Sequence, residues 1–143
     1  MKYCYEYPRA ALTADIIVYK KTDNQVFILL IERKHPPFAS MWALPGGFMN
    51  MDETIDQTAL RELEEETGIT GISLEQLHTF SKVDRDPRHR TVTTVFTGLA
   101  EYDLPVSAGD DAAKAQWFSM DSLPPLAFDH DEVIELFRKR ILK

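Results

Sequence analysis

Two apolar runs near the start of the chain predict a strand hairpin. Residues 12–19 (LTADIIVY) and 26–33 (VFILLIER) are rich in β-branched and large apolar side chains, which favour strands. The polar segment KKTDNQ between them has the composition of a turn. The prolines of HPPFASM, residues 35–41, then interrupt regular structure.

The pattern changes to a helical period from Thr54 onward. Thr54 and Gln57 have the spacing of a capping box, and Gly68 is suited to end the helix. HDEVIELFRKRIL, residues 130–142, has the period and charge order of an amphipathic helix. Strand-like runs lie between the two helices, at residues 74–83, 91–101 and 113–118. Because strands outnumber helices, we expect an α+β fold or an α/β fold with a mixed sheet.

The first helix carries a dense set of carboxylates. At about 100° per residue, Glu62, Glu65 and Glu66 fall on one face of it. Such groups repel one another unless a cation lies among them, and clustered carboxylates suit Mg²⁺, Mn²⁺ or Ca²⁺. Arg61 can orient Glu65 from four residues away, and Gly46 could offer a backbone carbonyl as a further ligand. A solvated acidic helix face is the alternative interpretation.

The spacing of fixed residues across this region resembles the Nudix box. From Gly47 the chain reads glycine, five residues, Glu53, seven residues and Arg61, and then continues as ELEEETGI to residue 69. This resemblance implies one Nudix domain over residues 1–143, an α/β fold built as an α/β/α sandwich with a mixed β-sheet. It also implies an enzyme that hydrolyses nucleoside diphosphates linked to another moiety.

The same resemblance assigns roles to residues of the box. It implies that Glu62, Glu65 and Glu66 bind Mg²⁺ or Mn²⁺, with the carbonyl of Gly46 as a further ligand. Glu53 and Arg61 would support them. The general base stays open among Glu62, Glu65 and a late acidic residue, for which Asp111 is the candidate, although Asp111 beside Gly109 also fits a plain turn.

Candidate substrate contacts lie outside the box. The segment DRDPRHR, residues 84–90, groups Arg85, Arg88, His89 and Arg90, which could bind phosphate or ribose phosphate or form a solvated hairpin tip. Arg33 could reach a substrate phosphate or be a cation at a sheet edge. Phe48 is a candidate to stack on a nucleobase.

The substrate is expected to be a nucleotide. ALPGGF, residues 43–48, together with the downstream DRDPR, is similar to ADP-ribose pyrophosphatases and to ADP-ribose-sensing domains of regulators of nicotinamide metabolism. We therefore expect a stand-alone enzyme that cleaves ADP-ribose to AMP and ribose 5-phosphate. A hydrolase that removes oxidised dGTP and a non-catalytic ADP-ribose sensor are the alternatives.

Composition limits the partners and the location. The formal net charge is −7, from 16 basic and 23 acidic residues, which disfavours nucleic acid as a partner. Cys4 is the only cysteine, which fits a reducing compartment such as the cytoplasm. The most apolar stretch, VFILLI, is too short to cross a bilayer, so no membrane association is expected. The resemblance adds a homodimer as the expected assembly.

Overall fold

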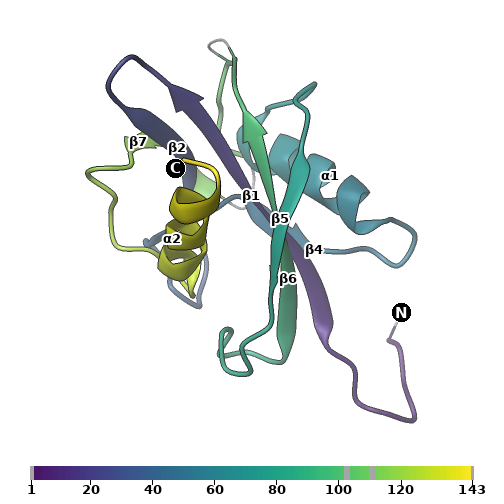
Figure 1. Ribbon diagram of the computed structural model, residues 1–143. Coiled ribbons are helices and arrows are strands. Elements are labelled where there is room, and N and C mark those ends of the chain that lie inside the picture. The colour runs from purple at the N-terminus through teal and green to yellow at the C-terminus, as the bar shows by residue number, and fades with distance from the viewer. Residues whose placement is uncertain (1, 102–103, 110–111, 143) are drawn as a thin grey trace.

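The computed structural model describes residues 2–101, 104–109 and 112–142, and within these ranges it forms one mixed sheet and two helices (Figure 1). The helices are α1, Ile55–Thr67, and α2, His130–Arg140. The strands are β1 Ala11–Lys21, β2 Val26–Arg33, β3 Trp42–Ala43, β4 Gly46–Phe48, β5 Glu75–Phe80, β6 Thr91–Leu99 and β7 Ala112–Ser119. None of the helices in the described ranges has the length and apolar character that a bilayer span requires.

The sheet is organised around β1. The strand order is β3-β2-β1-β6-β5, with β7 pairing with β2 and β4 pairing with β1. The pairing of β1 with β6 is parallel, whereas the other pairings are antiparallel. The sheet is therefore mixed, as the resemblance implied.

One edge of β1 is shared between two strands. Its last residues, Tyr19 to Lys21, pair with β2, whereas Thr13 to Asp15 pair with β4. Between these two pairings, the amide of Ile16 donates to the carbonyl of Pro45 at 2.9 Å. This division brings Gly46 and Gly47 beside the middle of the sheet.

Both faces of the sheet are covered. Ala14, Ile16 and Val18 of β1 pack with Ala59 and Leu63 of α1 in one core cluster. On the opposite face, Ile17 and residues of β2 pack with Val133, Ile134 and Phe137 of α2 in another. Successive strand residues point to opposite faces, so β1 is buried on both sides. Figure 1 shows α1 and α2 as separate layers on the sheet, and the predicted α/β/α sandwich is confirmed.

The longer predicted elements are confirmed, with shifted ends. The hairpin and both helices form where expected, but the strand predicted over 74–83 ends at Phe80 and the one over 91–101 ends at Leu99. The short strands β3 and β4 were not predicted. They have two and three residues, which is too short for a periodic pattern, and they are strands only because β2 and β1 pair with them.

Candidate active site

The start of α1 is fixed by its own sequence. The Thr54 hydroxyl accepts from the amide of Gln57 at 3.1 Å, and the Gln57 side chain accepts from the amide of Thr54 at 2.8 Å. At the other end Gly68 adopts a left-handed φ of 77°, which glycine tolerates. The predicted capping box and stop are confirmed, and they fix where α1 begins and ends.

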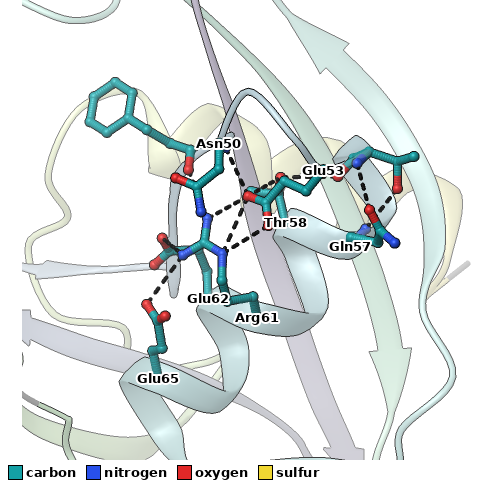
Figure 2. A network of polar contacts seen from close by, with 9 residues as sticks. Asn50, Glu53, Gln57, Thr58, Arg61, Glu62 and Glu65 are labelled. Carbon is teal, nitrogen blue, oxygen red and sulfur yellow. Dashed lines mark hydrogen bonds and ion pairs between the residues drawn. The ribbon is translucent and has the colours of Figure 1, made fainter. Parts of the chain in front are cut away.

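Arg61 is the centre of a polar network on α1 (Figure 2). Its Nη1 donates to Glu62 at 2.7 Å and to Glu65 at 3.2 Å. Its Nη2 donates to the carbonyl of Phe48 at 2.9 Å and to Glu53 at 2.6 Å, and Nε also donates to Glu53, at 3.0 Å. One guanidinium therefore orients three carboxylates and ties α1 to the end of β4.

Glu53 supports Arg61 as an ionised group. It also accepts from the amide of Asn50 at 2.8 Å and from the hydroxyl of Thr58 at 2.9 Å. The hydrogen bonds from Arg61, followed by the one from Asn50, lower the pKa of Glu53 to about 2. Pairing with Glu53 in turn raises the pKa of Arg61. Glu53 is therefore poorly suited to accept a proton and well suited to hold Arg61.

The two glycines of β4 place backbone directly against carboxylates of α1. Oε1 of Glu66 accepts from the amide of Gly46 at 2.7 Å. A Cβ added to Gly47 would collide with the Glu62 carboxylate, and one added to Gly46 would collide with the Ala14 carbonyl. Only glycine permits this approach.

The three glutamates of the box differ in their surroundings. Glu66 is 8% exposed, whereas the Glu65 side chain is 56% exposed. No three His, Cys, Asp or Glu side chains in the described ranges form a ready-made metal cluster. Glu62 and Glu66 nevertheless bring hard oxygen donors to one place beside β4, so the donor set fits Mg²⁺ or Mn²⁺.

A cleft of about 430 Å³ brings most of the predicted site residues together. The predicted residues that line it are Gly46, Arg61, Glu62, Glu66, Arg33, Phe48, Arg85 and Arg88.

Three predicted residues do not line the cleft, and a fourth is not among the described residues. Glu53 and Glu65 contact Arg61 without lining the cleft. Arg90 is exposed and donates to the carbonyl of Lys82 at 3.4 Å. Asp111 lies outside the described residues.

The arginines of the loop between β5 and β6 have different surroundings. Arg85 is buried, and its Nε and Nη2 donate to the two carboxylate oxygens of Asp129 at 3.0 and 2.7 Å. Arg88 is half-exposed and donates to Asp86 at 3.0 and 2.8 Å. Burial raises the pKa of Asp86, but the hydrogen bonds and charge of Arg88 outweigh burial and hold it at about 2. Both guanidinium groups are paired with a carboxylate of the protein, but Arg85 is buried, whereas Arg88 is exposed at the cleft.

A buried polar network that the sequence did not predict includes two residues that line the cleft, Asp15 and His130. Asp15 accepts from the Thr93 hydroxyl at 2.7 Å, and Nε2 of His130 lies 3.7 Å from the same carboxylate oxygen. Nδ1 of His130 accepts from the amide of Leu44 at 3.0 Å. Burial lowers the pKa of His130, which favours the neutral ring with its proton on Nε2. The ring thereby fixes the backbone just before Gly46.

Comparisons with known proteins agree with this geometry. The NUDIX domain family model matches residues 9–137. The chain is 42% identical over 129 residues to the ADP-ribose pyrophosphatase of Methanocaldococcus jannaschii, covering 90% of this chain and 73% of that protein. It is 32% identical to the ADPR responsive transcriptional repressor NtrR of Acinetobacter baylyi, covering 91% of this chain and only 54% of the repressor.

A solved structure shows the same likeness in three dimensions. The NUDIX domain of Shewanella oneidensis NrtR, crystallised with ADP ribose, superposes with a TM-score of 0.88 at 34% identity. The match covers 94% of this chain and 90% of that one. Fold, box and sequence similarity agree, and the chain therefore belongs to the Nudix family of hydrolases.

Proposed function

We propose that this chain hydrolyses the diphosphate of ADP-ribose, giving AMP and ribose 5-phosphate, with Mg²⁺ or Mn²⁺ as cofactor. The supporting observation is that one cleft contains both the carboxylates of Glu62 and Glu66 and the guanidinium groups of Arg33 and Arg88. A substrate with a diphosphate between two polar moieties needs both: carboxylates for a cation and cations for the phosphates. The 42% identity to an ADP-ribose pyrophosphatase supports this substrate over other linked nucleoside diphosphates.

The cation would be held by Glu62, Glu65 and Glu66, together with the carbonyl of Gly46. When bound, a divalent cation would neutralise the diphosphate and lower the pKa of a water molecule that attacks phosphorus. Arg61 keeps the carboxylates of Glu62 and Glu65 oriented through its 2.7 and 3.2 Å contacts. Glu53 keeps Arg61 in place.

The proton acceptor is one of the carboxylates near the attacking water. Glu62 lines the cleft and Glu65 does not, which favours Glu62 between these two. Asp111, the remaining candidate, lies outside the described residues. A general base must come within hydrogen-bonding reach of the proton that it removes, so the pH dependence of turnover in Glu62→Gln, Glu65→Gln and Asp111→Asn separates the three.

The other side of the cleft would bind the substrate's nucleotide. Arg33 and Arg88 would contact phosphate oxygens, and Phe48, which is 40% exposed, would offer a ring face to the adenine. Arg85 acts indirectly, because its bonds to Asp129 anchor the loop that carries Arg88. Arg90 is exposed and does not line the cleft, so we expect it to contribute little to substrate binding. The expected homodimer, cytoplasmic location and absence of a nucleic-acid partner stay predictions.

Product analysis tests this proposal. Purified protein is incubated with ADP-ribose or with oxidised dGTP, with Mg²⁺ or with a chelator, and AMP, ribose 5-phosphate and pyrophosphate are quantified. We expect AMP and ribose 5-phosphate in equal amounts, and only with the metal. Preferential release of pyrophosphate from oxidised dGTP would instead assign the chain to nucleotide sanitation.

A non-catalytic ADP-ribose sensor is the second candidate. It is favoured by the similarity to the NUDIX domain of NrtR, a structure solved with ADP ribose, and to a repressor described as ADPR responsive. Calorimetric binding of ADP-ribose without product formation, at saturating Mg²⁺ and Mn²⁺, would establish this role and exclude the enzyme.

A further inference from the structure

Two guanidinium groups share one aromatic ring in the cleft. Cζ of Arg33 lies 4.9 Å from the ring centroid of Phe128, and Cζ of Arg88 lies 5.7 Å from the same centroid. All three residues line the cleft. The ring attracts each cation, but the two cations repel each other. A negative charge nearby would reduce this repulsion.

That negative charge is only partly supplied by the protein. Arg88 has Asp86 as its carboxylate partner at 2.8 Å. Arg33 has no carboxylate within ion-pair distance in the part of the chain that the structure describes. Its Nε and Nη2 donate to the carbonyls of Pro37 and His35, at 2.7 and 3.4 Å. Burial and then the charge of Arg88 lower the pKa of Arg33, whereas the charges of Glu66, Asp86 and Asp15 raise it without a direct ion pair. A guanidinium stays charged in proteins, so Arg33 brings to the cleft a charge that no carboxylate of the described residues pairs with directly.

Phe128 is held in place by more than packing. Its φ is 55°, in the left-handed region that a bulky side chain rarely adopts. The preceding amide, of Ala127, donates to the carbonyl of Trp42 at 2.8 Å. The Phe38 ring makes an edge contact with a centroid separation of 4.8 Å, and the His130 ring lies 5.5 Å away. Unfavourable backbone held by several contacts is typical of functional positions.

We propose that Phe128 positions Arg33 and Arg88 as a clamp for one phosphate of the substrate's diphosphate. The proposal rests on the proposed function, and it adds a residue that neither the box nor the basic loop indicates. An anion between the two guanidinium groups removes their repulsion and receives charge-assisted bonds from both. Phe128 has two guanidinium groups and two rings around it, whereas Phe48 has one of each, Arg88 at 5.3 Å and the His89 ring at 5.7 Å. Phe48, which is 40% exposed, is therefore the better candidate for the nucleobase.

The test measures binding of inorganic pyrophosphate by calorimetry, in a chelating buffer without divalent metal. We expect Phe128→Leu to weaken this binding about tenfold, because leucine keeps apolar bulk but offers no ring to either cation. Arg33→Gln should weaken it by a similar factor. In the double variant the two losses should fall well short of additive, because both act on the same clamp. Phe128→Tyr, which keeps the ring, should bind within about threefold of the parent.

Two results would overturn the proposal. One is a folded Phe128→Leu protein that binds pyrophosphate within twofold of the parent. The other is additive losses in the double variant, which would mean that Phe128 acts on the fold and not on Arg33. If Phe128→Leu proves unstable by thermal melting, Phe128→Met provides the same comparison. The measurement needs neither metal nor turnover, so it tests the clamp even if ADP-ribose proves not to be the substrate. Conversely, a result against the clamp would not affect the outcome of the hydrolysis assay.

Discussion

Two ion-pair networks in this protein use the same chemistry in different surroundings. On α1, Arg61 pairs with Glu53 eight positions away and with Glu62 next to it, at a partly exposed surface. In the loop that precedes β6, Arg85 pairs with Asp129, which is 44 positions away, and both side chains are buried. The first network is local in sequence and partly exposed to water. The second joins distant segments and excludes water.

This difference suggests different roles: the Arg61 network orients side chains, whereas the Arg85–Asp129 pair stabilises the fold. Water can solvate an exposed carboxylate that loses its partner, so exposed pairs contribute little to stability. A buried partner left alone keeps an unsolvated charge, which is strongly destabilising. We therefore expect changes around Arg61 to affect activity, and changes around Arg85 to affect folding.

The largest expected effect is on stability. Asp129→Ala removes both acceptors of the buried Arg85 guanidinium and should lower the free energy of unfolding by about 3–5 kcal/mol. Urea unfolding followed by circular dichroism measures it. Asp121→Ala, at an exposed turn after β7, is the matched control and should change stability by less than about 0.5 kcal/mol. If Asp129→Ala lowers the free energy of unfolding by less than about 1 kcal/mol, the buried network stabilises the fold no more than an exposed one does.

On activity, the largest expected loss comes from Glu66→Gln. Removing one anionic donor beside Gly46 should lower turnover at least about a hundredfold while the protein stays folded. Glu64→Gln, on the same helix and exposed, should stay within about threefold of the parent. Steady-state turnover of ADP-ribose at saturating Mg²⁺ is the measurement. Activity of Glu66→Gln within tenfold of the parent would remove Glu66 from the metal ligands.

A smaller effect is expected in the basic loop. Arg88→Ala should raise KM for ADP-ribose by the equivalent of about 1.5–3 kcal/mol, the range for a hydrogen bond to a charged group. Arg90→Ala, at the exposed end of the same loop, should leave KM within about twofold. Arg85→Ala is unsuitable for this comparison because it would strand the buried Asp129 carboxylate. Equal KM changes in the Arg88 and Arg90 variants would show that the loop acts only through its overall charge.

The smallest effect is a pH dependence of stability. The folded-state pKa of Glu53 is about 2, below its ordinary value of 4.5. Its ionised form therefore stabilises the fold above about pH 4.5, and this contribution is lost as the pH falls toward 2. Between pH 5 and pH 3, the Tm of Glu53→Gln should fall by less than the Tm of the parent, as measured by thermal melting. Parallel Tm profiles of the two proteins would contradict this pKa.

Whether the sequence could predict each network depends on how far apart its members lie along the chain. The box spacing, the capping box of Thr54 and the stop at Gly68 all act within α1 and its loop, so the sequence predicts them. The partner of Arg85 is supplied only by the fold, and an arginine in a basic loop looks the same whether it binds a ligand or a buried aspartate. Asp15 did carry a signal, as a lone carboxylate inside the apolar run LTADIIVY. Phe128 carried none, because its role depends on its φ and its two cationic neighbours.

The bond between the Gly46 amide and Glu66 makes that amide a reporter of the site. Unlike the amides of β1, which lie in the middle of the sheet, the Gly46 N–H donates to a side-chain carboxylate at 2.7 Å. The rate of hydrogen exchange at this amide therefore depends on whether the Glu66 carboxylate keeps the hydrogen bond. If Glu66 held a cation, the NMR resonance of this amide would report any change in the hydrogen bond without a label or a substrate.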